Sequence, residues 1–382
     1  MASYILALFL RTWYSLDRVA ADPGYWVFKT ARTDLSWNFI TGYLYLNIVA
    51  RLIPAISAAF PIEMHAIVGG TLSHMIWLVC AGMIVAVIRA AGFGRLVAYF
   101  GGLALVLAPH ASESSLGNSG PIGFPLLVPL LLCSSMPQII KERPVSCTLF
   151  AAISAVTTPF TFIGSAILVL RTVILRERVD RGVGMFVAAS SLSLWLNLIV
   201  LGPTRILTGN GDKLFMPWDG MGWFWWSGLV GPVLVSGGVI FIWLFLRAKN
   251  RHISLGIALL AVAGLSLQVS LYWLGGIGDR YFVAPMTLSL ISLFLLLAES
   301  SEAFSKLIRL SVLLCVIVVV AAPSIKWFSA GSFLTRGPAW SAEVQRGQGI
   351  CRDSMSESVR LRTGDADITL SCEYLLGTYR PR

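Results

Sequence analysis

Two carboxylates stand close together in the first polar stretch of the chain, residues 14–61. Asp17 comes directly after an apolar N-terminal segment, and Asp22 follows shortly after it. A carboxylate in such a place can take a proton from a reacting hydroxyl or hold a divalent cation. Because Asp17 lies just past the apolar segment, we expect its side chain to face a cavity at the end of a helix.

A second polar stretch, 110–121, contains a histidine, a carboxylate and an amide in His110, Glu113 and Asn118, together with several hydroxyls. A short connection between two apolar segments does not need that density of polar groups, so these side chains are candidates for binding a polar ligand. The alternative is purely structural, because the residues from Asn118 to Pro121 also fit a turn that caps the following helix.

The stretches 203–224 and 275–282 supply cations and aromatic rings. Arg205 and Arg280 each carry a guanidinium that can bind a phosphate through two N–H donors, although Arg280 can equally pair with the aspartate before it. Trp218 belongs to a group of closely spaced tryptophans, Trp218, Trp223, Trp225 and Trp226. Such rings form either an aromatic belt at a membrane surface or a platform for a sugar ring or an isoprenoid chain.

The rest of the sequence must position these groups, and its composition indicates a membrane protein. Apolar residues make up 56% of the chain and charged residues only 13%, with a mean hydropathy of +0.77, whereas soluble domains carry about 25% charged residues. A soluble enzyme, a coiled coil, a secreted disulfide scaffold and a nucleic-acid-binding domain are excluded for the chain as a whole. We expect an all-α polytopic membrane protein with about 9–11 transmembrane or re-entrant helices. The strongest apolar runs are 62–88, 95–109, 122–137, 146–170, 183–202, 225–246, 253–274, 283–298 and 307–323.

The basic residues, which give a net charge of +10, predict the orientation of the helices, because Lys and Arg collect in short cytoplasmic loops. Clusters around Lys141 and Arg171 are separated by a single apolar run, 146–170, so a simple crossing would put one cluster outside. That run contains Thr157 and Pro159 at its centre, and proline interrupts a helix. We interpret the run as two half-helices that enter and return. The alternative is one kinked span, which would leave one basic cluster outside, against the preference of Lys and Arg for cytoplasmic loops.

With this topology the polar stretches lie outside and the cytoplasmic loops are short. We expect a transmembrane domain over 1–323, in which 14–61 forms a first external loop with an interfacial helix near 34–58, and a small external tail over 324–382. The apolar segment before Asp17 is interpreted as the end of a first helix, with the sequence starting inside that helix and without a cleavable signal peptide.

Two cysteines in the tail bear on the same topology. Cys351 and Cys372 flank two strand-like stretches, 358–362 and 367–371, which predict a β-hairpin. Outside the cytoplasm the pair can form a disulfide, which persists only in an oxidising compartment. The other four cysteines sit singly in apolar runs and are interpreted as packing residues.

The sequence contains no Walker loop, no zinc-type spacing and no nucleophile elbow. Its layout combines a short first helix, a long external loop bearing Asp17 and Asp22, many further spans with a break at 157–159, and an external tail with Cys351 and Cys372. This layout resembles the multi-spanning glycosyltransferases of the C-type fold, which use polyprenyl-phosphate sugars on the non-cytoplasmic face. The hallmark of that family is one or two acidic residues in the first external loop. The adjacent acidic pair that is usual there is missing here.

The resemblance implies an enzyme of the bacterial inner membrane, with its C-terminus outside, that moves a sugar from polyprenyl phosphate to an envelope glycan or lipid. Asp17 and Asp22 would be catalytic, and one of them would deprotonate the acceptor hydroxyl. The departing phosphate would be stabilised by arginines or by a divalent metal held by Asp17. The implied partners are the lipid-linked donor, the acceptor and membrane lipids, and no nucleic acid. The remaining implied contacts are Arg280 and Arg205 for the donor phosphate, and His110, Glu113, Asn118 and Trp218 for the acceptor or sugar.

Other classes of function stay open. A polytopic transporter or flippase would predict internal repeats and polar residues at mid-membrane depth, and the sequence shows no convincing repeat. An O-antigen ligase or polymerase also has large external loops and arginines. Such a protein concentrates them in one loop late in the chain, whereas the longest loop here is the first. A non-enzymatic scaffold that has lost its acidic residues is a further alternative.

Overall fold

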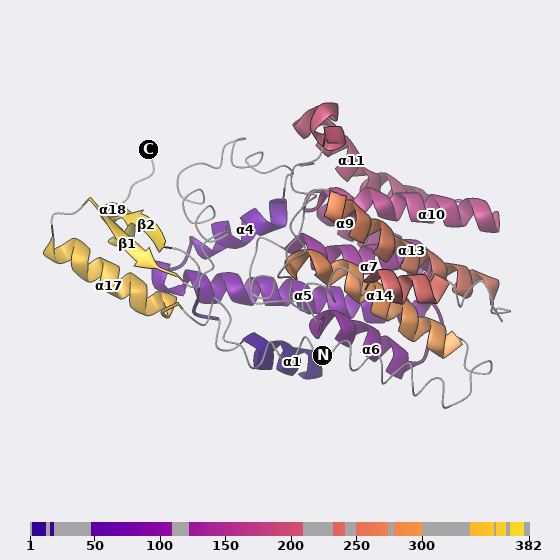
Figure 1. Ribbon diagram of the computed structural model, residues 1–382, viewed down its shortest axis with the longest axis horizontal. Helices are drawn as coiled ribbons and strands as arrows, with labels where there is room; N and C mark the ends of the chain where they lie inside the picture. The colour runs from indigo at the N-terminus through magenta and orange to yellow at the C-terminus, as the bar shows by residue number, and fades with distance from the viewer. Residues whose placement is uncertain are drawn as a thin grey trace, which may run out of the picture.

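The computed structural model describes residues 2–12, 16–18, 47–108, 122–208, 232–240, 250–273, 279–299, 337–354, 357–363 and 367–377. These residues are mostly helical. Three helical segments are long and apolar enough to cross a membrane, namely Ile62–Ala90, Arg251–Ser270 and Phe282–Glu299. Several shorter apolar helices pack around them (Figure 1).

The helical domain is built around a central helix, α7 (Gly123–Ser135), every residue of which is buried. A helix that is apolar on all sides is stable only when neighbours cover it completely, and α7 is in contact with α5, α9, α10, α13 and α14. The other described helices of the domain include α1 (Ala2–Thr12), α4 (Ile48–Ser57), η1 (Ile62–Met64), α5 (His65–Ala90), α6 (Arg95–Val106), α8 (Gln138–Glu142), α9 (Pro144–Ala155), η3 (Pro159–Thr161), α10 (Phe162–Leu175), α11 (Arg181–Thr208), α13 (Arg251–Trp273) and α14 (Asp279–Glu299), and residues 232–240 are helical as well.

The apolar run 146–170 is broken between α9 and α10, at the position that the sequence predicts. The two half-helices run in opposite directions along α11. At the start of α11, a Cβ on Gly182 would lie 2.8 Å from Pro144 Cβ, at the beginning of α9. Further along α11, Thr161 Oγ1, next to the break, donates to Ser193 Oγ over 2.7 Å. The chain therefore enters through α9, turns, and returns through α10.

The return brings the two basic clusters to the same end of the helical domain. Glu177, just after α10, lies 3.9 Å from Lys141 of α8 and 3.4 Å from Arg171 of α10. Its Oε1 is also 3.0 Å from Nδ1 of His252, at the start of α13. We call Lys141, Arg171, Glu177 and His252 the Glu177 cluster, and the end of the domain that carries it the basic end.

The C-terminal module consists of α17 (Trp340–Asp353), β1 (Ser358–Arg362), β2 (Asp367–Ser371) and α18 (Cys372–Leu375). The strands pair antiparallel with Leu361 opposite Ile368, so the predicted hairpin is present. Alternate side chains of both strands are buried, and they form a small core with Trp340 that also includes Ile62 and Ala66. The module is thereby seated on the start of α5, and Figure 1 draws it at the opposite extreme of the molecule from the end of α10.

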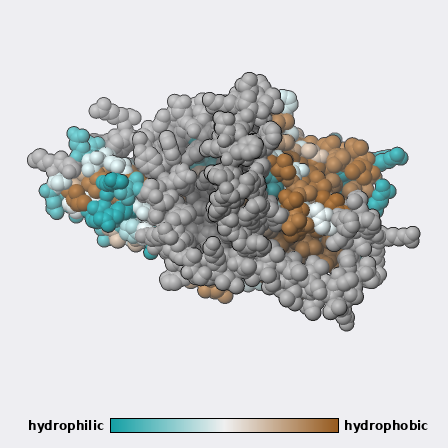
Figure 2. Space-filling model, in the orientation of Figure 1, coloured by the Kyte–Doolittle hydropathy of each residue, from teal (hydrophilic) through white to brown (hydrophobic). Residues whose placement is uncertain are grey.

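The described surface of the helical domain is apolar. In Figure 2 the coloured atoms of the right-hand half are mainly brown, whereas those of the module at the left are mainly teal and white. Of the expected interfacial helix, the structure describes only α4. Its residues Ile53 and Ser57 lie against Gly69 of α5, so α4 packs along the first part of α5. Residues 19–46 lie outside the described part of the chain.

Candidate functional site at the C-terminal module

Asp17, the first carboxylate of the sequence, caps the N-terminus of α17. Its Oδ1 accepts a hydrogen bond from the Ser341 backbone N–H (3.1 Å), and its Oδ2 accepts one from the Ser341 hydroxyl (2.5 Å). The Asp17 carbonyl accepts from the Trp340 N–H over 2.7 Å. The residue at the N-cap position, Ala339, has no side-chain oxygen that could accept hydrogen bonds from the first N–H groups of α17. A carboxylate here satisfies N–H groups that lack partners inside the helix and lies at the positive end of the helix dipole.

Further polar contacts fasten the module to the helical domain. Arg18 donates to the Gly337 carbonyl, and the Trp340 indole donates to the Ile62 carbonyl over 2.8 Å. Gln348 donates to Glu63 over 2.6 Å. The residues after α1 and the residues before α5 therefore hold the same short module.

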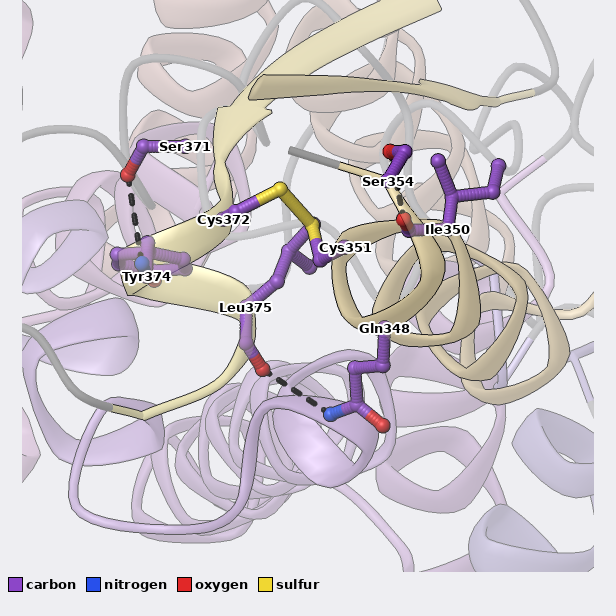
Figure 3. The surroundings of a disulfide bond; sticks show 8 residues. All are labelled: Gln348, Ile350, Cys351, Ser354, Ser371, Cys372, Tyr374 and Leu375. Atoms are coloured by element: carbon purple, nitrogen blue, oxygen red, sulfur yellow. Dashed lines mark hydrogen bonds between the residues drawn. A yellow bond between two sulfur atoms is a disulfide. The ribbon is translucent and has the colours of Figure 1, made fainter. Parts of the chain in front are cut away.

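A disulfide joins Cys351, on α17, to Cys372, the first residue of α18, with their Cα atoms 5.4 Å apart (Figure 3). These are the two cysteines that stood out in the tail. In Figure 3 the bridge lies between the helix and the end of the hairpin, beside Leu375, whose carbonyl accepts a hydrogen bond from Gln348. Cys372 belongs to the small core of the module and Cys351 packs against that core, so the disulfide ties α17 to α18 beside the apolar strand contacts.

Glu343 is a buried carboxylate inside the module. It accepts hydrogen bonds from Arg346 Nε (3.0 Å) and from the Arg362 N–H (2.8 Å). Burial pushes the pKa of Glu343 upward, but these hydrogen bonds and the neighbouring positive charges outweigh burial and hold the pKa below its ordinary value. The same contact raises the pKa of Arg346. Glu343 therefore stays ionised and links α17 to β1, which is a structural role.

The side chains of the other residues expected at the site lie outside the described part of the structure. Arg205 lies in the last turns of α11 and Arg280 at the start of α14, at positions whose side chains are not described. Asp22, His110, Glu113, Asn118 and Trp218 lie outside the described residues. Among the residues that are described, no group of three or more His, Cys, Asp or Glu side chains could hold a metal ion.

Arg51 is a buried cation that the sequence analysis did not single out. It lies on α4 and is only 6% exposed. The Ile48 N–H at the start of α4 donates to the Val156 carbonyl over 3.1 Å, which places this helix beside the turn between α9 and α10. A Cβ on Gly123 would lie 3.0 Å from Thr158, so the start of α7 meets the same turn. The sequence signal for Arg51 was a single arginine within the otherwise apolar helix Ile48–Ser57.

No protein-family model, no curated protein and no solved structure matches the chain.

Proposed function

We propose that the chain is an integral-membrane glycosyltransferase. It would move a sugar from a polyprenyl-phosphate donor to an envelope glycan or lipid acceptor on the non-cytoplasmic face of the bacterial inner membrane. The observation that carries the proposal is the separation of the two polar ends. The disulfide-closed module is held by the Asp17 segment at one end, and the arginine-rich loops lie at the other.

Two independent physical arguments give this separation the same orientation in a membrane. A structural disulfide persists in an oxidising compartment, which supports a location of the Cys351–Cys372 module outside the cytoplasm. Short loops rich in arginine stay in the cytoplasm, which puts the basic end inside. The first loop and the C-terminus are then external, where a lipid-linked sugar can be used without a nucleotide site.

In the proposed reaction, the acceptor oxygen attacks the anomeric carbon of the sugar while the bond from that carbon to the phosphate oxygen breaks. A carboxylate takes the acceptor proton, and polyprenyl phosphate leaves. We assign the base to Asp22, because the carboxylate of Asp17 already accepts two hydrogen bonds from Ser341 and positions the loop. The cations proposed for the departing phosphate are Arg280, Arg205 and the buried Arg51. Acceptor contacts are proposed for His110, Glu113, Asn118 and Trp218.

The test is a turnover assay with the full chain in proteoliposomes. A panel of polyprenyl phosphates carrying different radiolabelled sugars is supplied with envelope glycan, and release of polyprenyl phosphate is measured. Asp22→Asn should lower turnover about 100-fold or more, the range for loss of a general base. Asp353→Asn, the same change at an exposed position of the module, should leave turnover unaltered. If no donor on the panel yields polyprenyl phosphate, the assignment is wrong.

A second function, transport or flipping of a lipid-linked substrate, is favoured by the α9–α10 break. Helices interrupted within a membrane domain commonly form substrate sites in transporters, and the buried Thr157 and Thr158 lie at this break. The same proteoliposomes separate the two functions. A transporter would move the intact labelled lipid across the bilayer without cleaving it, and Asp22→Asn would not stop the movement.

A further inference from the structure

The loop between α10 and α11 forms a positively charged surface at the basic end. Four arginines occur between residues 171 and 181, but they do not face the same way. Arg171 is turned inward, with a side chain only 2% exposed. Its Nη1 donates to the Ser135 carbonyl (3.0 Å) at the end of α7 and to the His252 carbonyl (2.8 Å). Arg171 is therefore used to join helices and is not part of the outer surface.

The two carboxylates of this loop are also engaged in internal contacts. Glu177 faces Arg171, Lys141 and His252 within the Glu177 cluster. Asp180 Oδ1 accepts a hydrogen bond from the Val183 N–H over 2.8 Å, which caps the start of α11. Within the described part of the chain, neither carboxylate forms an ion pair with the three remaining arginines, Arg176, Arg178 and Arg181, all of which are exposed.

Apolar side chains lie directly beside these arginines. On the last turns of α10, Val173 is 67% exposed, and in the loop itself Val179 is 62% exposed. In Figure 2 a teal group at the right-hand extreme, where Figure 1 has the end of α10, borders the brown surface of the helices. Exposed guanidinium groups next to exposed valines suit a ligand with an anionic end, which the arginines can bind, and an apolar end, which the valines can contact.

We propose that Arg176, Arg178 and Arg181, together with Val173 and Val179, bind an anionic phospholipid. We call these five residues the α10–α11 surface. The guanidinium groups would bind the headgroup phosphate through paired N–H donors, and the valines would lie along the upper part of an acyl chain. The inference does not depend on the proposed transferase activity, because a transporter with the same surface would bind the same lipid.

The experiment measures binding of a fluorescent phosphatidylglycerol to the purified full chain in neutral detergent, with phosphatidylcholine as the uncharged comparison. The triple variant Arg176→Gln, Arg178→Gln, Arg181→Gln should weaken phosphatidylglycerol binding. The expected loss is roughly fivefold per arginine and about 100-fold in total, from the attraction of a basic residue to an anionic lipid surface. The matched control is Arg352→Gln, Arg360→Gln, Arg362→Gln, which removes the same charge from exposed positions of the module and should leave binding within about twofold.

Each alternative outcome overturns the proposal in a recognisable way. Equal losses in both triple variants would mean that binding reflects net charge alone. Equal affinity for the two lipids would mean that the arginines do not select an anionic headgroup. Complete displacement of the lipid by millimolar inorganic phosphate would assign the surface to free phosphate. If the glutamine variant does not fold, the triple lysine variant replaces it. Lysine keeps the charge but loses the paired donors, so an unchanged affinity in that variant would refute guanidinium recognition of the phosphate.

Discussion

Removing one partner of the Arg171–Glu177 pair should destabilise the whole helical domain. The Arg171 guanidinium is buried, and apart from the Ser135 and His252 carbonyls its described partner is Glu177, 3.4 Å away. Glu177→Gln removes the compensating charge and leaves the cation buried. Losing one member of a buried pair in this way costs about 3–5 kcal/mol, and because Glu177 keeps 19% of its side chain exposed we expect the lower part of that range.

A double variant, Arg171→Met with Glu177→Gln, tests whether the loss of stability comes from the Arg171–Glu177 pair. Arg171→Met replaces the guanidinium with an apolar chain of similar length, and the variant with both substitutions has neither charge of this pair. Arg171→Met leaves Glu177 beside Lys141 and His252, whereas Glu177→Gln leaves a buried cation. The double variant should therefore be more stable than Glu177→Gln alone, and its loss of stability should be smaller than the sum of the two single losses. We expect a coupling free energy of about 1–3 kcal/mol, within the range for residues in contact.

The measurement is equilibrium unfolding in mixed detergent micelles, followed by circular dichroism. The four proteins compared are the unsubstituted chain, the two single variants and the double variant. Arg178→Met, an exposed arginine of the same loop, is the control and should change the free energy of unfolding by less than about 0.5 kcal/mol. Additive losses in the double variant would show that Arg171 and Glu177 act separately, and the account of the basic end would then fail.

Three further perturbations address the module and the packing of α13. The variant Cys351→Ser, Cys372→Ser should destabilise the module by roughly 3 kcal/mol, because the disulfide closes a loop of about 20 residues, and faster proteolysis after α17 would report it. The pKa of Glu343 is lower in the folded protein than its ordinary value of 4.5. Its contribution to stability is therefore complete above that value and is lost as the pH falls through the lowered pKa. A pH series of module unfolding should show this loss in the native protein and not in Glu343→Gln. At Gly256 a Cβ would meet the Ser135 carbonyl at 2.7 Å, so Gly256→Ala should cost about 1–3 kcal/mol of unfolding free energy. Gly82→Ala, with no atom within 4 Å, should cost nothing in the same denaturation assay.

The features that sequence analysis predicted are those with a local signature. The break near Pro159 followed from a proline within an apolar run flanked by two basic clusters, and α9 and α10 end and begin at that position. The strand alternation over 358–362 and 367–371 correctly predicted the hairpin. Each of these predictions used a continuous stretch of sequence no longer than a few tens of residues.

The features that were missed depend on distant contacts. Arg171 was counted among the cytoplasmic loop arginines, but it lies on the last turn of α10, where α7 and α13 cover it. Arg51 was overlooked because its helix reads as apolar, and its burial depends on how α4 packs. Nothing in the residues around either arginine distinguishes a buried side chain from an exposed one, since burial is decided by helices that are far away in the sequence.

Asp17 shows that a carboxylate at a position predicted to be catalytic can also cap a distant helix. A carboxylate just after a helix satisfies the family pattern, yet an uncapped helix N-terminus that begins 323 residues later in the sequence needs the same group. The difference lies in what the carboxylate oxygens contact, and Asp17 has the Ser341 N–H on one oxygen and the Ser341 hydroxyl on the other. Asp17→Asn keeps one oxygen that can accept from the N–H and should retain most of the cap, whereas Asp17→Ala should lose about 1 kcal/mol of module stability. If Asp17 only positions the first loop, turnover should fall in step with module stability across the two variants. A complete loss of turnover in the asparagine variant, with the module intact, would return the role of base to Asp17.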